Sequence, residues 1–214
     1  MAIFENPADA LGGAYPKEPA RLAHSLAGDS LFSIEALARL AARLPRQHVE
    51  YNAGDLPVGV DPALTPSNGL SIDETIRRIE HCKSWMALKH VEQDPVYADA
   101  LERCLAEIAP VAERISGPMT KCIGFIFISS PGSVTPFHMD PEHNVLMQIS
   151  GEKRFHIFPA DAGIVSDEQH ELYHSGESHR NLAYRPEFAD LAAEHDLSPG
   201  NALYVPVKAP HWVR

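Results

Sequence analysis

Three short patterns in the sequence place an acid two residues after a histidine, a pair that can hold a metal ion. They lie at residues 48–50, 90–92 and 138–140. On a β-strand, residues i and i+2 point to the same face, so such a pair offers an imidazole and a carboxylate to one ion. Twelve histidines in 214 residues make these triplets common by chance. The pattern indicates metal chemistry only where a suitable strand and a third ligand accompany it.

Of the three triplets, His138-Met139-Asp140 has these surroundings. A β-branched and aromatic run with a turn precedes it, over residues 125–132. Downstream, a turn at 199–201 leads into a short apolar run and then to His211. Two histidines and one carboxylate leave part of a metal's coordination sphere open, as non-haem Fe(II) oxygenases require. We therefore take His138, Asp140 and His211 as candidate metal ligands and expect the other two triplets to be surface or packing residues.

The first half of the chain predicts mostly helices. Apolar residues repeat at helical spacing before Pro45, and Ser71 opens an S-x-x-E capping box. Asp94-Pro95 is a typical helix start, and Pro110 is expected to end that helix or nearly so. The expected helices span residues 34–44, 71–82 and 94–110, and the expected strands span 48–51 and 85–91.

After Gly117 the sequence changes to β-branched and aromatic runs separated by turns. The expected strands span residues 123–129, 144–149, 153–158 and 202–207. The two middle runs flank Ser150-Gly151-Glu152, which is typical of a hairpin. We predict one domain over residues 1–214, with 1–117 as a mixed, mainly helical cover and 118–214 as a β core.

Composition limits the classes of function. The net charge of -11 argues against nucleic acid as a partner, because that surface needs clustered lysines and arginines. Three widely spaced cysteines form neither a disulfide framework nor a zinc pair, which favours a reducing compartment. The first residues show no signal peptide, and no apolar run is long enough to cross a membrane. These features predict a cytoplasmic globular protein.

The candidate ligands lie within a longer series of motifs. Thr135-Pro136-Phe137-His138-Met139-Asp140 is followed by Asn144 and then by a run from Gln148 to Pro159 that contains Lys153. A distal Tyr204-Val205-Pro206 precedes His211. This order and spacing resembles the Jumonji-C/cupin-like Fe(II)- and 2-oxoglutarate-dependent oxygenases, and among them the asparaginyl hydroxylases. The resemblance covers about residues 122–214.

The resemblance implies a double-stranded β-helix (jelly roll), an α+β fold that is mainly β with an N-terminal helical cover. It also implies that His138, Asp140 and His211 hold Fe(II). The family couples oxidative decarboxylation of 2-oxoglutarate, with O2, to hydroxylation of a C–H bond. A protein or peptide side chain is the expected substrate, and a homodimer is compatible with the family.

The same resemblance assigns a pocket for 2-oxoglutarate. Lys153 and Thr135 would bind its distal carboxylate, and Asn144 would line the pocket. An ammonium among apolar residues is costly unless an anion meets it, so an inward-facing Lys153 implies an anionic ligand. The alternative is that Lys153 lies on the solvent face of a hairpin, and Thr135 and Asn144 are residue types common at turns and strand edges.

Two features depart from the family pattern. Family members often supply a tyrosine hydroxyl to the co-substrate from an upstream strand, and the counterpart here, residues 85–89, contains none. The chain also stops at Arg214, soon after His211, which we interpret as truncation; otherwise one sheet would have an unpaired edge beside the metal. Both favour an alternative function, a regulatory cupin that binds a metal or a small acid without turnover. A cupin isomerase or dioxygenase that does not use 2-oxoglutarate usually has more histidines in its first motif.

A second histidine-rich segment follows the β runs at residues 161–179. His170, His174 and His179, with Glu168 and Glu171, could form another metal site, since His170 and His174 are one helical turn apart. A solvated polar loop or a short helix is the interpretation that we favour for this segment.

Overall fold

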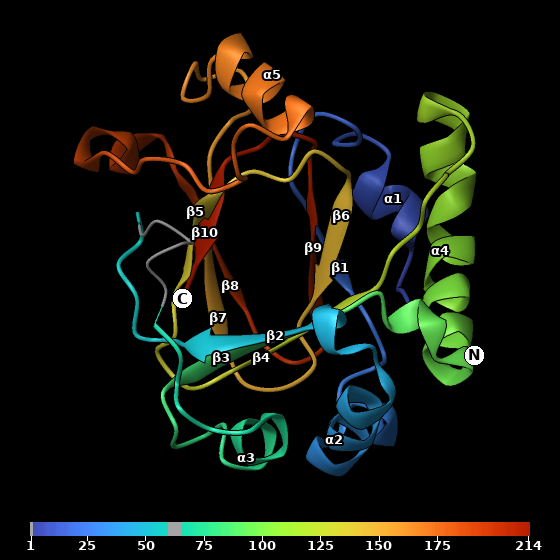
Figure 1. The fold of residues 1–214 in the computed structure, drawn as a ribbon. Coiled ribbons are helices and arrows are strands. Elements are labelled where there is room, and N and C mark those ends of the chain that lie inside the picture. The colour runs from blue at the N-terminus through green and yellow to red at the C-terminus, as the bar shows by residue number, and fades with distance from the viewer. Residues whose placement is uncertain (1, 60–65) are drawn as a thin grey trace.

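Ten strands form three antiparallel sheets in the computed structural model, which describes residues 2–59 and 66–214. The sheets have the strand orders β5-β10-β7-β8, β1-β9-β6 and β2-β3-β4. In Figure 1 the first two sheets face each other, and the third lies below them. The strands are β1 Ala20–Ala23, β2 Val49–Ala53, β3 Ser84–Lys89, β4 Phe125–Ser129, β5 Thr135–His138, β6 Asn144–Met147, β7 Lys153–Ile157, β8 Ala193–Leu197, β9 Asn201–Val205 and β10 His211–Val213.

Five described α-helices lie outside the sheets, with short 3-10 turns between elements. They are α1 Pro7–Leu11, α2 Ile34–Arg43, α3 Ile72–Arg77, α4 Pro95–Ser116 and α5 Asp167–Ser175. The predicted capping box is confirmed at α3, where the Ser71 hydroxyl accepts from the Glu74 N–H and the Glu74 carboxylate accepts from the Ser71 N–H. The predicted start of α4 is also confirmed, because the Asp94 carboxylate accepts the Val96 N–H.

The predicted end of α4 at Pro110 is wrong. The helix continues through this proline to Ser116, although proline removes one backbone hydrogen bond from a helix interior. Val111 and Ala112, just beyond it, are buried in a core cluster with Leu22 and Tyr204. Burial of this apolar stripe offsets the lost hydrogen bond. Neither α4 nor any other described helix is both long enough and apolar enough to cross a membrane.

Apolar side chains from both facing sheets fill the space between them. Phe155 and Ile157 of β7 pack with Leu203 and Val205 of β9, and Val213 of β10 joins the same cluster. Because side chains alternate along a strand, this cluster identifies the inner faces of β7, β9 and β10. Any residue that shares a face with these side chains points into the interior of the barrel.

The N-terminal part supplies strands as well as helices. β1 pairs with β9, and β2 and β3 form the third sheet with β4. One face of this third sheet, with Met86, Leu88 and Ile128, is buried against Leu40 of α2 and Ile76 of α3. The part before residue 118 is therefore mixed and contributes strands to two of the three sheets.

The hairpin predicted across Ser150-Gly151-Glu152 is wrong. β6 pairs with β9, whereas β7 pairs with β10 and β8, so the two runs belong to different sheets. Gly151 has a φ of 69°, a left-handed conformation that favours glycine and turns the chain sharply. The turn was recognisable from the sequence, but the partner of each strand depends on contacts made much further along the chain.

Candidate metal centre

The three candidate ligands come from the ends of two neighbouring strands. His138 is the last residue of β5, Asp140 follows two residues later, and His211 is the first residue of β10. His138 and His211 are directly paired across the antiparallel ladder, and their ring centroids are 4.1 Å apart. His138 and His211 are far apart in the sequence, and they meet because β10 pairs with β5.

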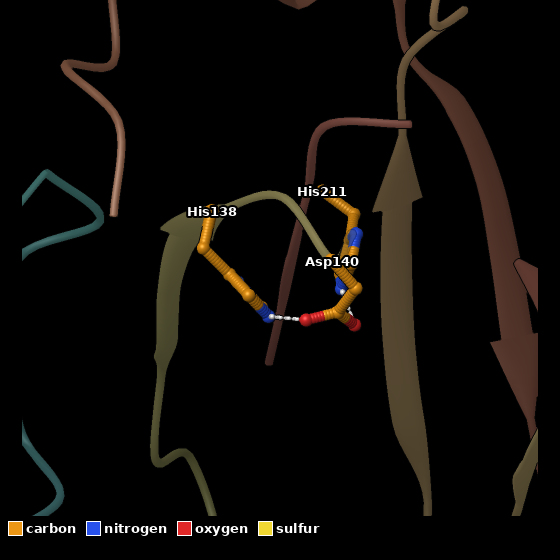
Figure 2. A group of neighbouring side chains, drawn as sticks. All are labelled: His138, Asp140 and His211. Carbon is orange, nitrogen blue, oxygen red and sulfur yellow. Dashed lines mark ion pairs between the residues drawn. The ribbon is translucent and has the colours of Figure 1, made fainter. Parts of the chain in front are cut away.

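The ligand atoms converge on one region, as Figure 2 shows. One nitrogen from each histidine and a carboxylate oxygen of Asp140 lie within 4.8 Å of one another. His138 Nε2 is 3.8 Å from Asp140 Oδ1, and His211 Nε2 is 3.6 Å from Asp140 Oδ2. The side chains of His138, Asp140 and His211 are 12%, 13% and 4% exposed. The group thus lies inside the barrel and keeps some access to solvent.

Backbone carbonyls orient both imidazoles. His138 Nδ1 is 2.7 Å from the carbonyl oxygen of Pro136, and His211 Nδ1 is 2.9 Å from that of Ala209. A carbonyl can only accept, so each Nδ1 carries the proton and donates it. Each Nε2 is then unprotonated and directs its lone pair toward Asp140. A metal ion binds a histidine in this neutral form.

Burial keeps these imidazoles neutral. Desolvation lowers the pKa of His138 to about 4, with Arg180 adding to the effect. Desolvation also lowers the pKa of His211 to about 3, helped by the neighbouring His138. Near neutral pH both rings are therefore uncharged and available as ligands.

Two further side chains hold the carboxylate of Asp140. Asn144 Nδ2 donates to Oδ2 at 2.7 Å, and Arg180 Nη1 donates to Oδ1 at 2.7 Å. The backbone N–H of Lys208 donates to the Asp140 carbonyl at 2.8 Å and ties this loop to the one that precedes His211. Hydrogen bonds of this kind restrict the orientation of a ligating carboxylate.

The arrangement fits a first-row divalent metal ion. It presents two neutral imidazole nitrogens and one carboxylate on one side of a common point, and hydrogen bonds support every ligand. This donor set is typical of non-haem Fe(II) sites. Among the described residues no second cluster of this kind forms. Residues 167–175 instead form the polar helix α5, capped by Ser166, so the second metal site considered for this segment is not formed there.

Lys153, predicted as the carboxylate anchor, faces the interior. It lies on β7 at even spacing from Phe155 and Ile157, whose side chains belong to the interior cluster. Its Nζ donates to Ser129 Oγ at 2.9 Å, and burial lowers its pKa. No carboxylate of a described residue lies within ion-pair distance of this ammonium. The solvent-facing alternative for Lys153 is therefore wrong, while its role toward 2-oxoglutarate stays a prediction.

Thr135 shares this interior face because of an irregularity in β5. His138 pairs with His211, but Thr135, three residues earlier, pairs with Val213, two residues after His211. The extra residue on β5 is a β-bulge, which lets positions an odd number apart point to the same side. Asn144 pairs with Val205 and also faces inward. The structure thus places the predicted pocket residues in the barrel interior, and their roles stay predictions.

Arg180 is the residue of this site that sequence reasoning missed. It lies after α5, in a stretch without regular secondary structure, and its carbonyl accepts the Met139 N–H at 3.2 Å. Its neighbour Asn181 forms an isolated bridge with His138. No periodicity or motif in the histidine-rich segment indicates that it returns to the metal centre.

A β-barrel with two histidines on adjacent strands, and an aspartate just after one of these strands, is typical of cupin-type metal proteins. The chain matches the Cupin-like domain family over residues 87–214 and belongs to that family. It is also similar to two curated proteins. It is 32% identical over 93 residues to lysine-specific demethylase JMJ30 of Arabidopsis thaliana, which covers 39% of this chain and 21% of that protein. It is 25% identical over 138 residues to lysine-specific demethylase 8 of Danio rerio, which covers 58% of this chain and 34% of that protein.

Solved structures share the fold. Escherichia coli ycfD aligns with 99% of this chain and 50% of its own, with a TM-score of 0.61 and 18% identity. A structure of YcfD, a ribosomal oxygenase from Escherichia coli, in complex with cobalt and 2-oxoglutarate aligns with 99% of this chain and 48% of its own, with a TM-score of 0.57 and 18% identity. The matches span about a fifth to a third of the curated relatives and about half of the solved chains. The family resemblance and the fold class predicted from the sequence are confirmed.

Proposed function

We propose that the protein is an Fe(II)- and 2-oxoglutarate-dependent oxygenase that hydroxylates a C–H bond of a protein or peptide side chain. One observation carries the proposal. Two imidazoles, whose Nδ1–H groups donate to backbone carbonyls, meet one carboxylate inside the barrel. The partly buried ammonium of Lys153 lies on the same inner face and meets no carboxylate among the described residues. The site thus presents groups for a metal and for an anion at once.

The residues of the chain would divide the work between binding and positioning. His138, Asp140 and His211 would bind Fe(II) from one side and leave the opposite side open. When bound, Fe(II) would supply the site at which 2-oxoglutarate and O2, the oxidant, react. Lys153 would bind the distal carboxylate of 2-oxoglutarate by a charge-assisted hydrogen bond in a low-dielectric interior. Phe155 and Ile157, on the same face of β7, would add apolar surface to the pocket.

The expected substrate class rests on the relatives. Two similar proteins are named lysine-specific demethylases, and a protein of the same fold is named a ribosomal oxygenase. These names indicate action on proteins, which supports a protein or peptide side chain as the substrate here. The net charge of -11 disfavours a phosphate backbone and therefore nucleic acid.

An anaerobic titration tests the proposal. Fe(II) and 2-oxoglutarate are added to the protein, and the weak metal-to-ligand charge-transfer band is recorded. We expect the band to saturate at one Fe(II) per chain and to be missing in Asp140→Ala. A folded protein that binds neither Fe(II) nor 2-oxoglutarate would refute the oxygenase assignment.

The second step measures turnover. With O2 present, succinate should form, and its rate should increase when the correct protein substrate is added. Saturable binding of Fe(II) and 2-oxoglutarate without succinate formation would favour the alternative, a regulatory cupin that binds a metal and a small acid.

Three sequence predictions concern the whole protein. A single domain over residues 1–214, a homodimer and a cytoplasmic location all stay predictions. Cys82, Cys104 and Cys122 are free thiols, which supports the reducing compartment that the cytoplasm provides. Light scattering of the purified protein measures the oligomeric state directly.

A further inference from the structure

A second polar group lies next to the ammonium of Lys153. Lys153 Nζ donates to the hydroxyl of Ser129, which is the last residue of β4. Ser129 is directly paired with Trp85 of β3 in the antiparallel ladder. Directly paired residues carry their side chains on the same face of a sheet, about 5 Å apart. Trp85 is therefore the cross-strand neighbour of the residue that holds Lys153.

The two faces of the third sheet confirm this orientation. Met86, Leu88 and Ile128 lie on the face that is buried against the helices. Trp85 and Ser129 alternate with these residues and so occupy the opposite face. The ring of Trp85 also contacts Phe127, with centroids 5.9 Å apart, which agrees with their positions on this face. This is the face from which Ser129 reaches Lys153.

The indole of Trp85 has an unused hydrogen-bond donor. Its Nε1 is buried and has no hydrogen-bond partner among the described residues. A buried donor without an acceptor is unfavourable, so native structures usually provide one. The nearby ammonium of Lys153 meets no carboxylate of the described chain either. One anion placed between the β2-β3-β4 sheet and β7 would accept hydrogen bonds from both the indole of Trp85 and the ammonium of Lys153.

We propose that Trp85 binds the co-substrate, with its indole N–H donating to the same distal carboxylate of 2-oxoglutarate that Lys153 holds. The inference rests on the proposed function and deepens it. A carboxylate has two oxygens and can accept from an ammonium and an indole at once. The upstream strand, which contains no tyrosine, thus provides a donor of another kind. Unlike a phenol, an indole N–H can only donate, so it favours an ionised carboxylate over a neutral or hydroxyl-bearing end.

A comparison of two ligands tests this role. 2-Oxopentanoate has the carbon chain and keto acid of 2-oxoglutarate but lacks the distal carboxylate. Affinities of both are measured anaerobically on the Fe(II) protein, and their ratio reports recognition of the distal carboxylate. Trp85→Phe keeps an aromatic ring and removes the donor. We expect it to weaken 2-oxoglutarate about tenfold, as for a hydrogen bond to a charged group, and to leave 2-oxopentanoate unchanged.

Trp212 provides a matched control. Its Nε1 is likewise buried without a partner among the described residues, but it is paired with His156 and stacks on that ring at 3.8 Å. It therefore occupies the outer face of β10, whereas His211 faces inward. Trp212→Phe should keep the ratio of the two affinities. An equal loss of ratio in both tryptophan variants would overturn the specific role of Trp85.

A spectroscopic measurement leaves Trp85 intact. The chain has two tryptophans, so Trp212→Phe makes Trp85 the single indole fluorophore. The protein is loaded with Zn(II), an ion without redox chemistry, in place of Fe(II). 2-Oxoglutarate should change the Trp85 emission in a saturable way, and 2-oxopentanoate should change it much less. Binding of 2-oxoglutarate, followed by calorimetry, with no change in emission would contradict the contact.

The outcomes separate this inference from the proposed function. A wild-type protein that binds both ligands equally, or neither, refutes the 2-oxoglutarate site itself. A wild-type protein that prefers 2-oxoglutarate, loses this preference in Lys153→Ala and keeps it in Trp85→Phe refutes the role of Trp85 alone.

Discussion

His138-Met139-Asp140 and His90-Val91-Glu92 have the same pattern and different surroundings. In the first, both residues face a third ligand, His211, and each imidazole bonds through Nδ1 to the backbone. In the second, His90 Nδ1 is 3.2 Å from Glu92 Oε1, and Glu92 Oε2 accepts the Gly124 N–H at 2.9 Å. The Glu92 carboxylate therefore bonds to His90 and to the backbone of Gly124.

In the third triplet, His48-Val49-Glu50, the histidine and the acid also bond to side chains other than a third metal ligand. Glu50 forms an ion pair with Lys89, and His48 Nδ1 is 2.7 Å from Gln93 Nε2. The rings of His48 and His90 are 4.8 Å apart, yet no third ligand joins them among the described residues. The comparison teaches that a histidine and an acid become a metal site only when other groups hold the imidazole Nδ1 atoms and a further strand brings a third ligand.

The largest expected effect distinguishes the acids of these pairs. Asp140→Ala should weaken Fe(II) binding by about a thousandfold or more, about 4 kcal/mol, because it removes a charged ligand. Glu92→Ala, the matched change in the other pair, should leave the affinity unchanged. Isothermal titration under anaerobic conditions measures both, and circular dichroism checks that each variant folds. Stoichiometric iron in Asp140→Ala would show that the wrong acid was chosen.

Lys153 and Lys89 provide a similar comparison for the binding of 2-oxoglutarate. Lys153→Ala should raise the required concentration of 2-oxoglutarate by one to several powers of ten, since a buried charge-assisted contact is worth about 2–4 kcal/mol. Lys89→Ala removes an ion pair with Glu50 whose members are 36% and 43% exposed, so it should not change this requirement. Titration of the charge-transfer band compares the two variants. If both variants required the same concentration of 2-oxoglutarate, Lys153 would not belong to its binding pocket.

The third prediction concerns the amides that support each pair. Asn144→Ala removes the hydrogen bond to Asp140 Oδ2 and should weaken metal binding about 10- to 100-fold, as for other residues that orient a ligand. Gln93→Ala removes the corresponding contact to His48 and should leave the affinity unchanged. Competition with a metal chelator of known affinity measures the difference. A tight site in Asn144→Ala would mean that Asp140 is oriented without this amide.

The fourth prediction concerns how the stability of the metal-free protein depends on pH. The folded pKa of His138 is about 4, below the ordinary value of 6.5, so between these values the unfolded chain binds more protons. This histidine should therefore make stability fall by up to about 1.4 kcal/mol per unit as the pH decreases from 6.5 to 4. His138→Gln should flatten that slope, and His90→Gln should keep it and retain metal binding. Urea unfolding at several pH values provides the slopes, and identical slopes in both variants would contradict the burial of His138.

The sequence was sufficient for much of the site because the ligands lie close to recognisable turns. His138 follows the turn after β4, and His211 follows a turn, a strand and a proline. Local signals also predicted α2 and the starts of α3 and α4. These elements depend on capping and periodicity, which neighbouring residues determine.

Features that depend on distant contacts were not predictable in this way. The partners of β6 and β7 are set by β9, β10 and β8, which come later in the chain. Arg180 reaches Asp140 because its segment bonds to Met139 at the end of β5. The β-bulge that turns Thr135 inward exists only when β10 lies beside β5. In each case tertiary pairing, which no short window contains, decides where a side chain points.

Because β10 lies between β5 and β7, the proposed metal site can form only after long-range strand pairing. His211 can meet His138 only after β10 has been inserted between strands that precede it by many residues, and pairings of such long range form slowly. An incompletely folded chain would offer separate side chains and bind the ion weakly. A metal that binds the native state alone stabilises it, by about 2.7 kcal/mol at a hundredfold excess over the dissociation constant. The iron supply of the cell would therefore govern how long the folded protein persists as well as whether it can react.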